Sequence, residues 1–175
     1  MEKITDLSKT EKEEKNLSPR EKLLSLEKEG KFVFHGSPDS IEILEPKQPL
    51  IFNKQSKARE KHGEPCVAAT PYADIAIFRA VVNPRNFPEK GYASSFGVNK
   101  DNTARLCATK QVLENIKDKK GFVYVLDKSS FEKFSDMEWR SEQIIKPNEV
   151  ILITADDLPS NIQLIDKDFN PIKNE

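Results

Sequence analysis

The stretch Phe34-His35-Gly36-Ser37 carries the first side chains of this sequence that are suited to chemistry. Residues 32–34 form an apolar, β-favouring run, which predicts a buried strand that is ended by Gly36 and Pro38 and has His35 as its last residue. A glycine leaves room for a ligand near the backbone, and its amide and carbonyl can pair with a flat polar group. His35 would add a donor and an acceptor there. The alternative is a structural histidine that bonds a neighbouring carbonyl at the strand end.

A second stretch joins a strand of small residues to a helix. Cys66–Ala69 predicts a tight strand, after which Thr70 is expected as the N-cap and Pro71 as the first helical residue. Tyr72 would lie in the first turn, where its ring can stack on a planar group or simply pack at the helix start. The 3.6-residue period predicts that one helix face is buried, and this face comprises Ala73, Ala76, Ile77, Ala80 and Val81.

A third stretch places a carboxylate beside a predicted strand. Glu142 immediately precedes the β-favouring segment 143–145, so it is expected where a strand opens and can reach into a cleft. The alternative is an exposed acidic residue on the strand. Trp139 and Arg140 come just before it, and a turn at 146–148 leads into a further strand over 150–154.

Other segments are expected to surround these residues. Ser18, Pro19 and Glu21 form a capping-box pattern, which predicts a helix to about Glu29 with Gly30 as its stop. Residues 47–65 predict a long loop that borders a site or is merely solvated. Its basic residues could meet phosphates, and they are Lys54, Lys57, Arg59 and Lys61, with His62 expected to be exposed.

The second half of the chain predicts short elements. Residues 83–104 are rich in turn formers and indicate a second loop or a short hairpin that borders the same site, with Tyr92 and Phe96 on either side of Ser94 and Ser95. A helix is expected to begin at Thr109. Strands are predicted over 121–127 and 161–165.

Composition predicts one cytoplasmic domain. The chain has 175 residues, 28 basic and 29 acidic, so no global charge attracts nucleic acid. We divide it into a flexible charged segment (1–17), a single domain (18–165) and a polar tail (166–175).

No apolar run reaches the length of a membrane helix, and the N-terminus does not resemble a signal peptide, so no membrane partner is expected. Cys66 and Cys107 are expected to be reduced thiols, without the spacing of a zinc site or disulfide framework.

The order of these stretches resembles the ADP-ribosyltransferase fold. A strand with Phe-His-Gly-Ser, a strand with Ala-Thr-Pro before a helix, and Val-Tyr-Val-Leu followed by Glu-Trp-Arg-Ser-Glu are most similar to the His-Gly-Thr/Ser branch. That branch contains the rifampin-inactivating ADP-ribosyltransferases and, more distantly, the poly-ADP-ribose polymerases and RNA 2'-phosphotransferases. The resemblance covers residues 31–155. It implies an α+β fold with a split, twisted β-sheet and flanking short helices.

The resemblance also implies an NAD site without a metal. NAD would be the co-substrate, with His35 bonding the adenine-side ribose, the Gly36 backbone pairing with the nicotinamide carboxamide, and Ser37 assisting. Thr70 would join this set, and the ring under nicotinamide would be Tyr72 or Tyr92. Glu142 would contact the nicotinamide ribose, because cleavage of the glycosidic bond builds positive charge that a carboxylate stabilises. His35 and Glu142 are therefore the catalytic candidates.

The implied activity is transfer of ADP-ribose from NAD to an acceptor, with release of nicotinamide. The acceptor is open between a small molecule, a protein and a nucleic acid. Arginine modification is disfavoured, because Arg140 stands where toxin-like arginine-specific transferases have a second acidic residue. Two alternatives are a catalytically silent domain of this fold that binds a partner and an RNA 2'-phosphotransferase-like enzyme. The latter needs several Arg and His residues, and this chain has two His.

Overall fold

The computed structural model describes residues 17–53, 55–88 and 91–172. Apart from Leu17, the predicted flexible segment 1–17 lies outside the described residues, as do residues 173–175 of the predicted tail. The elements in chain order are α2 (Pro19–Glu29), β1 (Phe32–Ser37), β2 (Leu50–Asn53), β3 (Ala58–Lys61), β4 (Val67–Ala69), α3 (Ala73–Val81), β5 (Ser94–Val98), β6 (Ala104–Ala108), α4 (Lys110–Glu114), β7 (Lys120–Asp127), η1 (Lys128–Ser130), β8 (Glu132–Lys133), β9 (Trp139–Ser141), β10 (Glu149–Thr154), η2 (Ala155–Asp157) and β11 (Gln163–Leu164).

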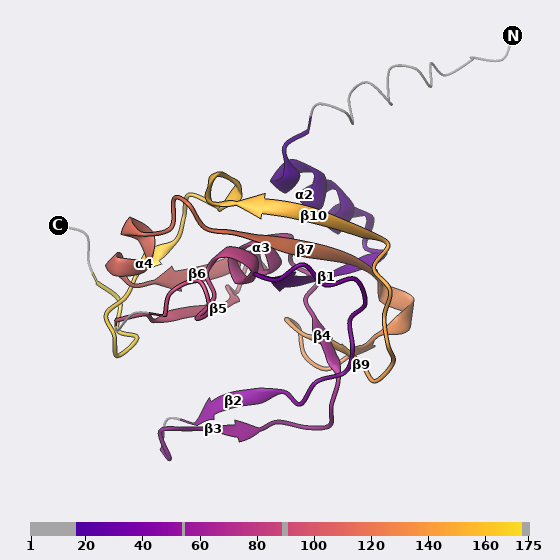
Figure 1. Ribbon diagram of the computed structural model, residues 1–175, viewed down its shortest axis with the longest axis horizontal. Coiled ribbons are helices and arrows are strands. Elements are labelled where there is room, and N and C mark those ends of the chain that lie inside the picture. Colours follow the sequence, from indigo (N-terminus) through magenta and orange to yellow (C-terminus); the bar gives the residue numbers. More distant parts are fainter. Residues whose placement is uncertain (1–16, 54, 89–90, 173–175) are drawn as a thin grey trace, which may run out of the picture.

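The central sheet has the order β1-β7-β10, and both neighbours of β7 are antiparallel to it (Figure 1). The strands predicted over 121–127 and 150–154 are β7 and β10 and are confirmed. The predicted end of the first strand is wrong. β1 continues past His35, because Gly36 pairs with Val123 and Ser37 pairs with Phe122. His35 is therefore an internal residue of β1.

Helix α3 lies directly on this sheet, and two glycines make the close approach possible. A Cβ on Gly36 would overlap the Ala76 carbonyl oxygen and lie 2.9 Å from the Ala80 nitrogen. A Cβ on Gly121 would overlap the Ala80 carbonyl oxygen. The missing side chain of Gly36 thus makes room for a helix rather than for a ligand, which corrects the role expected from the sequence.

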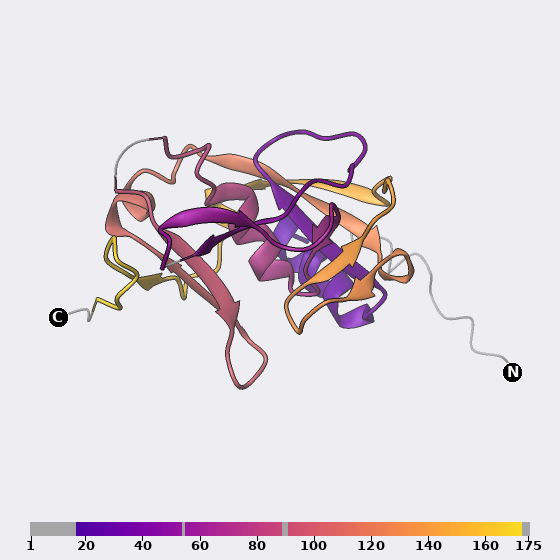
Figure 2. The same ribbon diagram turned by 90° about the horizontal axis from the view of Figure 1, so that it is seen from below.

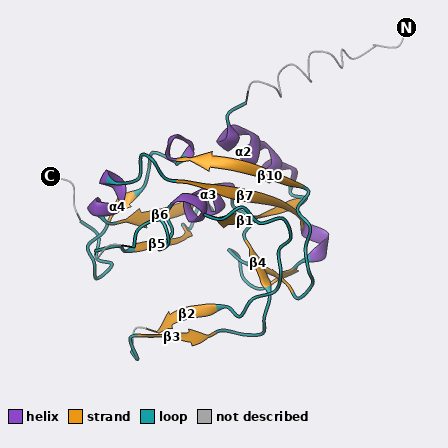
Figure 3. Cartoon of the chain, in the orientation of Figure 1, coloured by secondary structure: helices purple, strands orange, loops and turns teal. Residues whose placement is uncertain are grey.

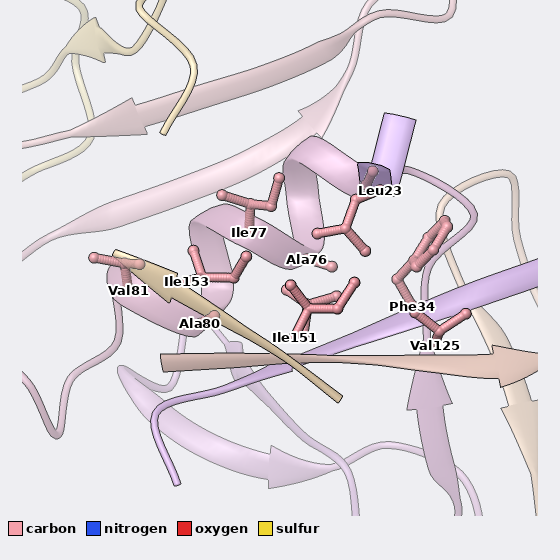
Figure 4. Close-up of a cluster of buried hydrophobic side chains, with 11 residues drawn as sticks. Leu23, Phe34, Ala76, Ile77, Ala80, Val81, Val125, Ile151 and Ile153 are labelled. Atoms are coloured by element: carbon pink, nitrogen blue, oxygen red, sulfur yellow. The ribbon is translucent and has the colours of Figure 1, made fainter. Parts of the chain in front are cut away.

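The core between α3 and the sheet contains the helix face that the period predicts. Ala73, Ala76, Ile77, Ala80 and Val81 are all buried there, together with residues of α2, β1, β7 and β10 (Figure 4). A second face of α3 packs toward β5, β6 and α4, and the buried residues of that cluster are Ile75, Phe78, Val82, Phe87, Leu106, Ala108 and Val112. The helix is therefore covered on two sides.

The start of α3 differs from the prediction. The N-cap is Tyr72, not Thr70, and Pro71 precedes the helix. Thr70 still belongs to the sheet, because its N–H donates to Phe34 O at 2.8 Å and its carbonyl accepts from Phe34 N at 2.7 Å. These two bonds join β1 to the strand β4 and delay the helix by two residues.

Helix α2 holds the N-terminal end of α3 in place. The predicted capping box at Ser18 and Glu21 and the left-handed Gly30 at the other end are confirmed. Glu27 of α2 accepts a hydrogen bond from Ala73 N at 2.6 Å, and Arg20 forms a bidentate ion pair with Asp74 at 2.8 and 3.0 Å. Burial raises the pKa of Glu27. Side chains of one helix thus satisfy the free amide and the acidic residue at the start of the other.

Two hairpins occupy segments for which the sequence predicted a loop in one case and a loop or a hairpin in the other. Strands β2 and β3 form one of them within residues 47–65, and it extends away from the other elements (Figure 1). The expected long loop is therefore wrong, and Lys54 lies outside the described residues. Strands β5 and β6 form the second hairpin, which was one of the two options for residues 83–104 and is visible from below in Figure 2.

The remaining strands form small sheets at the periphery. β4, β9 and β8 form one antiparallel sheet, and β9 (Trp139–Ser141) ends just before Glu142. Glu142 therefore follows a strand, whereas the sequence predicted that it opens one. β11 lies within the predicted 161–165 strand and pairs in parallel with β6, and Thr109 caps α4 as expected. With several small sheets and separate short helices (Figure 3), the α+β class is confirmed.

In the part of the chain that the structure describes, none of the helices has the length and apolar character needed to cross a membrane.

The glycine contacts predict a large and specific loss of stability in Gly36→Ala. The added methyl group collides with helix backbone that cannot rotate away, so we expect a loss of about 3 kcal/mol or more in the free energy of unfolding. Gly30→Ala is the control, because its Cβ would meet no atom within 4 Å and only the φ of 70° is unfavourable; a loss of about 1 kcal/mol is expected there. Urea unfolding measures both, and equal losses would contradict the close packing of α3.

Candidate functional site

A cavity of about 540 Å³ opens where β1, β4 and α3 meet the hairpin β2–β3. This volume lies in the range typical of small-molecule sites, roughly 300–1,000 Å³. Its polar and aromatic lining comes from elements far apart in sequence and includes His35, Lys47, Gln48, His62, Thr70, Arg79, Phe96, Glu138 and Arg140. The segment before and including β2 forms one wall through Pro49, Leu50 and Ile51. Residues 47–65 were expected to border a site, and residues of this segment line the cavity from the β2–β3 hairpin and from the stretches beside it.

His35 projects into this cavity from β1 as a neutral imidazole. Its Nδ1 lies 2.8 Å from Ala68 O, which can only accept, so Nδ1 carries the proton. Burial lowers the pKa of His35 to about 4, against the opposing effect of the Ala68 bond and with smaller contributions from Arg79 and Lys47. The Nε2 lone pair is then free to accept a hydrogen bond from a ligand. The alternative interpretation from the sequence was a structural histidine that bonds a neighbouring carbonyl, and the bond to Ala68 O is such a bond.

Glu138 supplies a carboxylate to the same cavity. It precedes β9, where Arg140 pairs with Ala68 of β4, so the two strands bring this segment beside His35. Arg140 Nε donates to Glu138 Oε1 at 2.5 Å, and its guanidinium stacks 3.4 Å from the centre of the Phe134 ring. Arg140 thus fixes the carboxylate and is itself held from the other side.

His62 also contributes to this wall, although it was expected to be an exposed loop residue. It is half-buried, its carbonyl accepts from Arg140 Nη1 at 3.4 Å, and its ring meets Phe134 edge-on at 5.5 Å. The residue follows β3, so the hairpin brings it to the cavity.

Arg79 and Phe96 form the opposite part of the lining. The Arg79 guanidinium lies 5.2 Å from the centre of the Phe96 ring, and Phe96 is 38 % exposed. Arg79 projects from the third face of α3, away from the two apolar clusters. Burial lowers the pKa of Arg79, and the negative charge of Glu138 opposes this effect.

Glu142, the catalytic candidate from the sequence, lines a second cavity of about 540 Å³. This cavity also contains Glu64, Glu132 and Lys133, and it shares Cys66 and Arg140 with the first. Glu142 itself is exposed. The structure therefore separates Glu142 from His35. Two acidic residues line the cavity of this histidine, Glu45 and Glu138, and of these Glu45 is exposed whereas Glu138 is half-buried.

Of the remaining candidates near His35, only Thr70 lines the first cavity. Its Oγ1 accepts from Tyr72 N at 3.3 Å. Ser37 is buried, and its Oγ accepts from Asp39 N at 3.2 Å. Gly36 is buried as well. Successive residues of an antiparallel strand direct their N–H and C=O groups to opposite sides, so those of Gly36 point to the same side of β1 as those of Phe34. This is the side of β4 and not the side of β7.

Neither candidate stacking ring lines the first cavity. Tyr72 and Tyr92 both pack against the apolar cluster between α3 and β6. The Tyr92 ring stacks on Phe87 at 5.8 Å, and its hydroxyl lies 2.6 Å from Ser94 Oγ. The packed alternative given for Tyr72 is therefore observed, and the aromatic ring that the cavity offers is Phe96.

Reasoning from the sequence did not single out Arg79, Phe96 or Glu138. Arg79 had a local signal, because it and Asp74 are the charged residues of the otherwise apolar helix α3. Phe96 lies in the segment 83–104 that was expected to border the site, but its place in the cavity follows from the β5–β6 pairing, as that of Glu138 follows from the β4–β9 pairing. No protein-family model, curated protein sequence or solved structure matches this chain significantly.

The burial of His35 predicts a specific dependence of stability on pH. Its pKa is about 4 in the folded chain and 6.5 when unfolded, so the unfolded state takes up a proton first as the pH falls. Stability is expected to decrease from pH 6.5 down to about pH 4, by about 2 kcal/mol after allowance for partial exposure. Urea unfolding at several pH values should show a shallower slope for His35→Gln. An imidazole NMR signal of His35 that titrates near pH 6.5 would contradict this.

Proposed function

We propose that this chain is an NAD-dependent ADP-ribosyltransferase, which cleaves the nicotinamide–ribose bond and transfers ADP-ribose to an acceptor. One observation supports this more than any other: a neutral histidine, a carboxylate, a guanidinium and an aromatic ring line one cavity, and these are His35, Glu138, Arg79 and Phe96. The proposal includes an ADP-ribosyltransferase-type arrangement of the small sheets. The acceptor is a small molecule, a protein or a nucleic acid.

The lining residues suit the parts of NAD that do not react. His35 Nε2 is an acceptor at neutral pH, so it can receive a hydrogen bond from a ribose hydroxyl. The Phe96 ring presents a partly exposed surface on which a planar base can stack. These contacts would position the dinucleotide before any bond breaks.

The reaction needs a negative charge near the ribose that loses nicotinamide. The bond between the ribose C1' and the nicotinamide nitrogen breaks, its electron pair leaves with nicotinamide, and positive charge develops on the ribose. The acceptor then forms a bond to C1' and releases a proton. Glu138 is the half-buried carboxylate that lines the cavity with His35, whereas Glu45 of the same lining is exposed, and the Arg140 Nε at 2.5 Å holds the orientation of Glu138.

Removal of the His35 imidazole tests the binding part of the proposal. His35→Ala should weaken NAD binding about 10-fold, because one hydrogen bond to the ligand is lost. Isothermal titration with NAD measures the affinity of both chains. Thermal unfolding of the variant at pH 7 is the control for folding. Wild-type chain that fails to bind millimolar NAD would contradict the proposal and favour a silent domain that binds a partner.

A pair of isosteric variants tests the chemical step. Glu138→Gln should reduce nicotinamide release by about 100-fold or more and leave NAD affinity within about twofold, because the carboxylate acts on charge that appears only in the transition state. Glu142→Gln is the matched control and should retain turnover. The reverse result would assign the carboxylate role to Glu142, as the family resemblance implies. Loss in neither variant would overturn the assignment of this cavity.

A further inference from the structure

Arg79 is a cavity-lining cation without an anion. Within the described part of the chain its side chain takes part in no hydrogen bond or ion pair, and the contact of its guanidinium is the Phe96 ring at 5.2 Å. The other arginine of this cavity, Arg140, has both Glu138 and a backbone carbonyl as partners. Guanidinium groups in a protein interior are normally paired, because loss of their hydration is costly.

The surroundings of Arg79 hold its charge in place. It occupies the last turn of α3, where the helix dipole favours a cation. Phe96 supports one face of the guanidinium. Glu138 influences its pKa but is bonded to Arg140 at 2.5 Å, and no ion pair joins Glu138 to Arg79 among the described residues. The donors of Arg79 are therefore oriented toward the cavity without a partner from the chain.

The size and shape of this donor set indicate the class of ligand. A guanidinium presents several N–H groups in a plane, which matches two oxygens of a phosphate or diphosphate. The cavity is lined by three cationic residues, Lys47, Arg79 and Arg140, and by two acidic ones, Glu45 and Glu138. Because Glu138 is ion-paired with Arg140, the charge nearest Arg79 that has no ion pair is its own, and the lining as a whole has an excess of positive charge.

We propose that Arg79 is the anchor for the diphosphate of a nucleotide that occupies this cavity. The identification of that nucleotide as NAD rests on the proposed function, but the anchor itself does not. With Arg79 at the diphosphate and His35 at a ribose hydroxyl, the two residues would fix the ligand at successive groups along its length. Glu138 would remain for the reacting ribose.

Titration with ADP and with inorganic pyrophosphate tests this anchor independently of any reaction. Wild-type chain should bind ADP, and Arg79→Gln should weaken this binding by about 10- to 100-fold, as expected for a charge-assisted bidentate contact. Arg79→Lys should retain part of the affinity, and added salt should weaken wild-type binding more than that of Arg79→Gln. Arg105→Gln is the control, because Arg105 is exposed on β6 and does not line the cavity.

Thermal unfolding separates an anchor from a structural arginine. Without ligand, Arg79→Gln should unfold at the same temperature as wild type or higher, because a half-buried cation without an ion pair has been removed. ADP should raise the unfolding temperature of wild type and of Arg105→Gln but not that of Arg79→Gln. A destabilised Arg79→Gln that still binds ADP like wild type would overturn the proposal.

The outcomes also separate this proposal from the proposed function. ADP binding that depends on Arg79, without release of nicotinamide from NAD, would support the anchor and contradict the transferase. Nicotinamide release in a chain whose ADP affinity is unchanged by Arg79→Gln would support the transferase and overturn the anchor. If wild type binds neither ADP nor pyrophosphate at millimolar concentration, the anchor is wrong.

Discussion

The close contact between α3 and two glycines of the central sheet is the constraint on which the rest of the structure depends. Gly36 and Gly121 leave no side chain between the strands and the helix backbone at Ala76 and Ala80. The helix therefore lies deep enough to bury one face against β1, β7 and β10 and a second against β6 and α4. Arg79 occupies neither face, and so it reaches the cavity. Larger side chains at these two positions would move α3, and Arg79 with it.

The charged groups of the cavity differ in their partners. Arg140 and Glu138 form a pair supported by the Phe134 ring, and His35 is neutral because burial lowers its pKa to about 4. Among the described residues, the half-buried Arg79 side chain contacts the Phe96 ring and forms no ion pair. Partial burial of an unpaired cation costs hydration, and a ligand that supplies an anion would offset this cost. Functional sites often contain residues that are unfavourable for the stability of the fold.

Local signals in the sequence predicted the elements better than the site. The capping box at Ser18, the left-handed Gly30, the apolar period of α3 and the strands β7 and β10 follow from neighbouring residues, and all are confirmed. The end of β1 could not be predicted in this way. Glycine and proline normally indicate a strand end, but here Gly36 is kept in the strand by Val123 and by a helix about 40 residues later in the chain.

The same limit applies to the residues of the site. His35, Thr70 and the bordering segment 47–65 were predicted, and they do line one cavity. The choice between Glu138 and Glu142 depends on where β9 begins and ends against β4. Each residue is two positions from Arg140, so the two-residue period of a strand alone would give both the same face. Tyr72 and Tyr92 satisfied the composition expected of a stacking ring, but tertiary packing uses them in the apolar cluster with Phe87. Sequence patterns give residue types, whereas the cavity results from pairings between distant strands.

The β4–β9 pair also determines how two substrates could meet. Cys66 and Arg140 line both cavities, so these strands form a shared wall with Glu138 on one side and Glu142 on the other. A transferase must bring an acceptor to the reacting carbon without passing it through the space filled by the donor. If the donor occupies the cavity of His35 and Arg79, the neighbouring cavity offers the acceptor a separate approach. In that arrangement Glu138 would act on the reacting ribose, Glu142 would border the path of the acceptor without taking part in bond cleavage, and Arg140 would lie in the wall between them.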